Sequence, residues 1–84
     1  MIIKLSNEQK IFLIENVISQ DQFTIIDKFK RVFNKWEINI NEDIIDNIRD
    51  LCIDKLQIVG FDENYKLNKD GIILEELIDL FYVE

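Results

Sequence analysis

The chain has 84 residues, a length that fits one small domain, and 48% hydrophobic residues, which favours a folded domain over a disordered chain. It has no proline and two glycines, and this scarcity of turn formers favours long helices over a turn-rich β fold. A net charge of −7 argues against binding to nucleic acid or to anionic lipid, and favours a basic protein as partner.

The first half of the chain predicts two helices. A Ser-Asn-Glu-Gln motif at residues 6–9 has the form of a capping box, and the apolar residues after it follow helical spacing as far as Ser19. A second box of the same form at residues 19–22 predicts a second helix over about residues 20–36. Its apolar positions recur at three- and four-residue steps: Phe23, Ile26, Phe29, Phe33 and Trp36.

The second half predicts two more helices. Asn41 is a suitable N-cap for a third helix that ends at Val59, with Gly60 in the left-handed position just past it. A polar loop with an Asp-Gly turn signal follows, and residues 65–67 and 72–74 allow a short hairpin across it. A last helix carries Leu77 and Phe81. We therefore expect residues 1–84 to form one all-α domain, a four-helix bundle with room for a short hairpin or turn near residues 65–74.

The negative charge is concentrated in the second half of the chain. Residues 1–41 contain five acids and six bases, whereas residues 42–84 contain twelve acids and four bases. On a helical wheel the aspartates of the third helix fall in one stripe about 80° wide, opposite its apolar residues. The members of this acidic stripe are Asp43, Asp46, Asp50 and Asp54.

This acidic stripe has two interpretations. Most charged helix faces are simply solvated, and that interpretation remains open for each single aspartate. Like charges four residues apart cost a few tenths of a kcal/mol per pair, however, and aspartate is a weaker helix former than glutamate. The stripe is therefore a candidate surface for the lysines and arginines of a partner, continued past the helix by Asp62, Glu63 and Tyr65.

Other kinds of site are not supported by the sequence. Aligning Gly71 with the glycine of a calcium loop places Lys66 and Leu77 at positions that need acids. There is no histidine and one cysteine, Cys52, which lies among apolar positions of the third helix and is expected in the core. We therefore expect no enzyme, no metal and no cofactor. The lone cysteine, the lack of a long apolar run and an N-terminus unlike a signal peptide predict a cytoplasmic protein.

The bases of the second predicted helix and Trp36 are expected to have structural roles. Four bases gather in the second predicted helix, and we expect them to balance acids on neighbouring helices: Lys28, Lys30, Arg31 and Lys35. Trp36 ends an apolar stripe and is expected in the core or at its edge.

Two segments resemble the colicin D immunity proteins. The first runs Phe-Leu-Ile at residues 12–14 and then Ile-Ser-x-x-x-Phe at residues 18–23. The second runs Asn-Tyr-Lys-Leu-x-x-Asp-Gly at residues 64–71 and then Leu-Ile-x-x-Phe at residues 77–81. Order and spacing agree over about residues 11–82.

This resemblance implies a function. Members of that family are small helical proteins that bind the nuclease domain of their own toxin, a tRNase, and fill its basic cleft with acidic side chains. It implies that Asp54, Asp62 and Glu63 contact the toxin. Related pairs of toxin and immunity protein occur in contact-dependent growth inhibition systems of bacteria.

The leading hypothesis is therefore an immunity protein, or antitoxin, that binds and neutralises a basic bacterial nuclease toxin, with a tRNase expected. We expect the cognate toxin domain as partner, and no nucleic acid, membrane or small-molecule substrate. One alternative is a helical adaptor or assembly subunit that binds a protein through an apolar face. Another is an acidic mimic of DNA that competes for DNA-binding enzymes.

Overall fold

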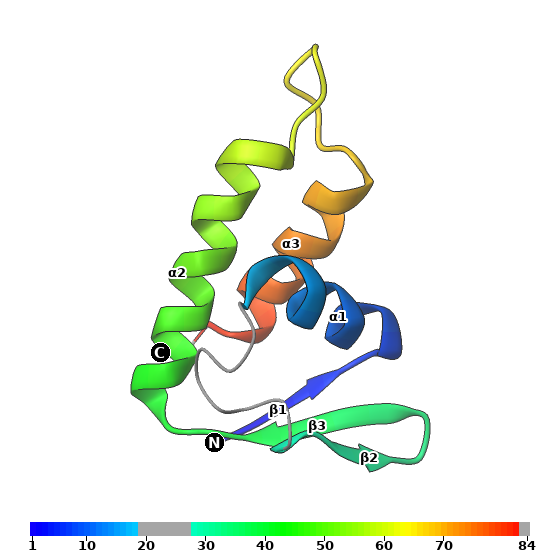
Figure 1. Ribbon diagram of the computed structural model, residues 1–84, viewed down its shortest axis with the longest axis vertical. Coiled ribbons are helices and arrows are strands. Elements are labelled where there is room, and N and C mark those ends of the chain that lie inside the picture. The colour runs from blue at the N-terminus through cyan, green and yellow to red at the C-terminus, as the bar shows by residue number, and fades with distance from the viewer. Residues whose placement is uncertain (19–27, 83–84) are drawn as a thin grey trace.

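A computed structural model describes residues 1–18 and 28–82, and it shows an α+β fold (Figure 1). The predicted all-α four-helix bundle is therefore wrong, because a three-stranded antiparallel sheet takes the place of one helix. The elements in chain order are β1 (Ile2–Leu5), α1 (Asn7–Phe12), a π-helical segment η1 (Leu13–Val17), β2 (Lys30–Val32), β3 (Lys35–Asn39), α2 (Glu42–Val59) and α3 (Lys69–Leu80).

The sheet has the order β1-β3-β2, so the third strand lies in its centre. Leu5 pairs with Trp36 across β1 and β3, and Val32 pairs with Lys35 across β2 and β3. Side chains alternate between the two faces of a strand, and Ile3, Leu5 and Ile38 are buried on the face that meets the helices. The same alternation carries Trp36 to the edge of the core, where it is half-buried as expected.

The predicted second helix is wrong over residues 30–36. Residues 30–36 form β2, a turn and the start of β3, while residues 20–27 and the capping box at residues 19–22 lie outside the described residues. Phe33 occupies the turn with a φ of 57° and is 95% exposed, so it does not contribute to a buried helical stripe. The helical spacing does not hold through Phe33 and Trp36, because β3 pairs with both β1 and β2 and alternates its side chains with a two-residue period.

Two predicted helix starts are confirmed. The Ser6 hydroxyl accepts a hydrogen bond from the amide of Gln9 at 3.1 Å, and the Gln9 side chain accepts one from the amide of Ser6 at 2.9 Å. Asn41 caps α2 by accepting from the amide of Ile44 at 2.9 Å. Both caps satisfy amide groups that have no partner within the helix.

The predicted hairpin near residues 65–74 is wrong, because residues 72–74 belong to α3. The Asp-Gly pair lies in the first turn of that helix, where the Asn68 side chain accepts from the amide of Gly71 at 2.8 Å. Gly60 has a φ of −83°, so the expected left-handed conformation is also wrong. A Cβ at Gly71 would collide with the carbonyl oxygen of Gly60. Glycine at position 71 therefore permits close contact between the start of α3 and the end of α2, and its conformational freedom plays no part.

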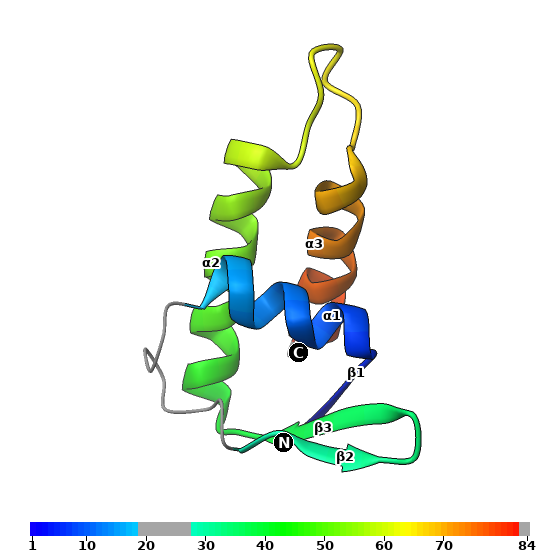
Figure 2. The same cartoon turned by 45° about the vertical axis from the view of Figure 1, so that its right-hand side comes forward.

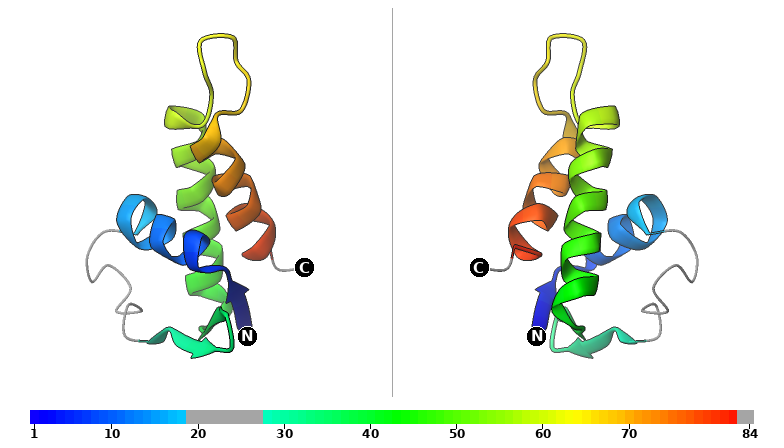
Figure 3. Two further views of the ribbon diagram at one scale, coloured as in Figure 1. Left: turned by 90° about the vertical axis from the view of Figure 1, so that its right-hand side faces the viewer. Right: turned by 90° about the vertical axis from the view of Figure 1, so that its left-hand side faces the viewer.

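One hydrophobic core connects the described elements. Helices α2 and α3 lie side by side, α1 packs across them, and the sheet closes one end of the molecule (Figures 2 and 3). The fully buried side chains include Leu5, Leu13, Ile38, Ile45, Ile48, Cys52, Leu74, Leu77 and Phe81. The predicted core position of Cys52 is confirmed. This arrangement leaves the outer face of α2 and the loop after it free for contact.

Candidate protein-binding surface

The acidic stripe lies on the outer face of α2. Asp43, Asp50 and Asp54 are exposed, and Asp46 is half-buried. The buried residues of this helix, which are Ile45, Ile48 and Cys52, lie on the opposite side. The orientation predicted from helical periodicity is therefore confirmed, while the role of the stripe in binding stays a prediction.

Little of this negative charge is neutralised by ion pairs among the residues that the structure describes. Arg49 forms an ion pair with Asp46 at 3.4 Å, and its guanidinium also lies 5.8 Å from the ring of Tyr82. Among residues 1–18 and 28–82, no ion pair reaches Asp50 or Asp54. Because only the half-buried aspartate has a cationic partner, the exposed ones keep their charge available for another molecule.

The loop of residues 61–67, here the exit loop, is shaped by the carboxylate of Asp62. One carboxylate oxygen accepts from the amides of Asn64 at 2.8 Å and of Lys66 at 3.0 Å. The amide of Tyr65 donates to the carbonyl oxygen of Asp62 at 3.0 Å, with a φ of 61° at Tyr65. Asp62 thus orders the loop, a role that the sequence did not reveal. Glu63 and Tyr65 are left fully at the surface.

The base of the exit loop is fixed to both helices. Phe61 and Leu67 form a β-bridge, and the amide of Asn68 donates to the carbonyl oxygen of Gly60 at 2.9 Å. The Asn68 side chain donates to the carbonyl oxygen of Val59 at 2.7 Å. These bonds close the loop at its neck, so it projects beyond the ends of α2 and α3 (Figures 1 and 3).

Apolar side chains are also exposed at this end of the molecule. Ile58 is 78% exposed and Tyr65 is 87% exposed, and Phe61 and Leu67 are partly exposed. Sequence reasoning missed Ile58, although on the helical wheel it lies about 40° from Asp54 and so borders the acidic stripe. Aromatic and apolar side chains beside charges are typical of the central residues of protein interfaces.

The basic cluster lies at the other end of the molecule. Lys30, Arg31 and Lys35 are exposed on the β2–β3 hairpin, and Lys28 is exposed just before it. The placement of these bases on a helix was therefore wrong, and in the described part of the chain no ion pair joins them to an acid. The hairpin and the exit loop lie at opposite ends (Figures 1 and 2), so this basic cluster is far from Asp62 and Glu63.

The described residues offer little basis for metal binding, thiol chemistry or membrane insertion. The described residues contain no group of three or more candidate ligands that could hold a metal ion. Burial raises the pKa of the Cys52 thiol from 9.0 to about 12, which leaves no reactive thiolate near neutral pH. None of the helices in the described ranges is long and apolar enough to cross a membrane.

Comparisons with protein-family models, with curated proteins and with solved structures found no match to this chain.

Proposed function

We propose that this chain is an immunity protein, which binds and neutralises a basic nuclease toxin of the tRNase class in the bacterial cytoplasm. The observation that carries the proposal is the acidic stripe on the outer face of α2, in which Asp46 alone has an ion pair within the described residues. Carboxylates held on a rigid helix can pair with the lysines and arginines of an RNA-binding cleft and so exclude the RNA.

The exit loop supports the proposal because it continues the acidic surface beyond the end of α2 and has an ordered conformation. Glu63 adds a charge, and Tyr65 adds a rigid, exposed aromatic side chain. Asp62 fixes the loop before the partner arrives, which lowers the entropic cost of binding. The resemblance to colicin D immunity proteins supplies the class of nuclease.

The test uses a toxin domain encoded beside the gene for this chain. We expect the wild-type chain to restore growth of cells that express this domain and to block tRNA cleavage by the purified domain. A triple variant, Asp43→Asn with Asp50→Asn and Asp54→Asn, should bind at least about 100-fold more weakly and associate with a smaller salt dependence.

The matched control removes three exposed charges from α3, through Glu75→Gln, Glu76→Gln and Asp79→Asn. This control has the same net charge as the first variant, and we expect it to bind nearly as tightly as wild type. Equal losses in the two variants would show that only net charge matters. Unchanged protection by the stripe variant would refute the proposal.

A second candidate function is an adaptor or assembly subunit, and the exposed apolar side chains near the exit loop favour it. In that case Ile58→Ser with Tyr65→Ser should abolish binding to the protein partner, whereas the stripe variant should bind normally. Association would then respond little to salt, because apolar contacts are not screened.

A further inference from the structure

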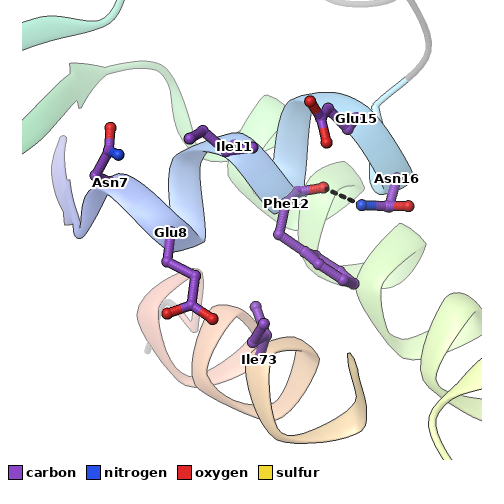
Figure 4. A pocket seen from close by; sticks show the side chains of 7 residues that line it. All are labelled: Asn7, Glu8, Ile11, Phe12, Glu15, Asn16 and Ile73. Carbon is purple, nitrogen blue, oxygen red and sulfur yellow. Dashed lines mark hydrogen bonds between the residues drawn. The ribbon is translucent and has the colours of Figure 1, made fainter. Parts of the chain in front are cut away.

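A shallow groove lies between α1 and α3, on a different side of the molecule from the acidic stripe. Its volume is about 340 Å³. Its apolar surface comes from Ile11 and Phe12 of α1 and Ile73 of α3, and Glu8 and Glu15 lie toward its two ends (Figure 4). An apolar cavity of about 150 Å³ is enough to hold benzene, so this groove has room for an aromatic ring.

The groove is negatively charged because Glu8 and Glu15 line it and no lysine or arginine does. The one base of α1, Lys10, lies over the ring of Trp36 at 3.7 Å, on the side of α1 that faces the sheet. Glu8 and Glu15 are seven residues apart, or about 10 Å along a helix. Along α1 and η1 the pattern is therefore acid, apolar, acid.

The tip of the β2–β3 hairpin has the complementary pattern. Phe33 is 95% exposed in the turn, with Arg31 and Lys35 two residues away on either side. Its φ of 57° is unfavourable for an aromatic residue, and exposure of its ring to water is unfavourable as well. Neither cost is offset by a contact within the described residues.

We propose that this chain associates with a second copy of itself, with Phe33 of one copy in the groove of the other. The ring contacts Ile11, and the bases beside it pair with Glu8 and Glu15. Phe33 and the groove, which lack a partner within the described residues, thus become partners of each other, and Arg31, which lies 5.4 Å from the ring of Trp36, is within the same hairpin. The proposal is independent of the proposed function, because the outer face of α2 and the exit loop take no part in it.

The contact is expected to be weak. An aromatic side chain buries roughly 150–250 Å², and even with flanking residues the area is small for a stable dimer. The net charge of −7 also opposes contact between two copies. We therefore expect association in the upper micromolar range that weakens as salt screens the ion pairs.

Sedimentation velocity from about 10 µM to about 1 mM measures this association. We expect the mean sedimentation coefficient of the wild-type chain to rise with concentration. Phe33→Asn should weaken association at least about tenfold, because the ring is the central contact. Asparagine tolerates the left-handed conformation, so this variant keeps the turn.

The chain contains a matched control. Tyr65 is also exposed, at 87%, with a φ of 61°, but it lies in the exit loop, away from the hairpin. Tyr65→Asn should therefore self-associate as wild type does. Equal behaviour of the Tyr65→Asn and Phe33→Asn variants would overturn the proposal, as would a wild-type chain that stays monomeric at the highest concentration.

Mixing two variants tests the pairing directly. Phe33→Asn keeps an intact groove, and Ile11→Gln with Glu15→Lys keeps an intact hairpin. Each alone should stay monomeric, while an equimolar mixture should form pairs, because each supplies what the other lacks. Circular dichroism and thermal unfolding establish that both variants are folded. A mixture of folded variants that remains monomeric would refute the assignment of groove and hairpin as partners.

Discussion

Gly71 shows how one missing methyl group sets the distance between two helices. It lies in the first turn of α3 against the backbone of Gly60, and a Cβ there would collide with the carbonyl oxygen of Gly60. The side chain of Leu67 would also lie 2.9 Å from that Cβ. Backbone atoms cannot turn aside as a flexible side chain can, so a larger residue would push α3 away from the end of α2.

Replacement of this glycine by alanine should therefore destabilise the protein. Alanine is the better helix former by roughly 0.5–1 kcal/mol, but the collision should cost more, and we expect a net loss of about 1–3 kcal/mol. Urea unfolding measures the change. Lys69→Ala, at an exposed position in the same turn, is the control and should change stability by less than about 0.5 kcal/mol. A Gly71→Ala variant as stable as this control would show that the close contact is not essential.

The buried thiol of Cys52 makes the stability of the fold depend on pH. Burial raises the pKa of the folded thiol to about 12 from 9.0, so the folded protein holds the proton more tightly than the unfolded chain. The thiol therefore favours the folded state fully below pH 9.0, and this contribution is lost as pH rises toward 12. We expect unfolding free energy to fall more steeply over this range in wild type than in Cys52→Ala.

The alanine variant contains the same lysines and tyrosines, so the difference between the two curves isolates the thiol. A second readout is the rate of thiol labelling near pH 8, which should be far slower in the folded protein than in the urea-unfolded chain, because the fold must open to expose the thiol. Fast labelling of the folded protein would contradict the burial of Cys52.

At the scale of elements, Asn68 joins two helices with one side chain. Its oxygen accepts from the amide of Gly71 at the start of α3, and its nitrogen donates to the carbonyl oxygen of Val59 at the end of α2. This side chain thus satisfies one free backbone group on each helix. The closed neck of the exit loop depends on both bonds.

Two substitutions at this position separate the two bonds. Asn68→Ala removes both and should cost about 1–3 kcal/mol, whereas Asn68→Ser keeps a capping oxygen without placing an acceptor against the carbonyl oxygen of Val59 and should cost less. Asn41→Ala, which removes only the cap of α2, provides the comparison and should cost about 1 kcal/mol. Thermal unfolding measures all three. Equal stability of the Asn68→Ala and Asn41→Ala variants would show that the bond to Val59 contributes nothing.

The sequence predicted features that depend on a few neighbouring residues. The caps at Ser6 and Asn41 and the outward direction of the aspartates follow from local hydrogen bonding and helical periodicity, and the structure contains all of them. The fold class was missed because the sheet depends on pairing of Ile3 with Ile38, which are far apart in sequence. Periodicity within a short window carries no information on such pairing.

The sequence also predicts only the part of the candidate site that depends on local periodicity. The acidic stripe was found because its members repeat at helical spacing. The ordering role of Asp62 was missed, because it depends on a loop conformation with a positive φ at Tyr65. The sequence predicts the basic cluster but on the wrong element, because the apolar spacing that includes Phe33 predicts a helix where the chain forms the β2–β3 hairpin.

At the scale of the whole molecule, the exit loop is separate from the folding core. No residue from 61 to 67 belongs to the buried core, and the neck of the loop is closed by bonds at Gly60 and Asn68. A change within the loop should therefore affect binding without affecting the rest of the fold.

We expect replacement of residues 62–66 by a two-residue Asn-Gly turn to leave the unfolding free energy within about 1 kcal/mol of wild type. The same variant should bind the toxin domain at least about tenfold more weakly, because Glu63 and Tyr65 are lost. Circular dichroism and urea unfolding check the first expectation, and calorimetric titration checks the second. A variant that fails to fold would show that the loop stabilises the junction of the two helices.

The segregation of charge has a consequence for the first moments of an encounter. Acids of the last turns of α2 and of the exit loop, such as Asp54 and Glu63, lie toward one end of the molecule, and the bases of the hairpin lie at the other, so these charges give the molecule a dipole component along its length. In the field of a cationic partner this dipole produces a torque that turns the acidic end forward before any atoms touch. A larger share of collisions then begins in the productive orientation, and the hairpin trails on the far side.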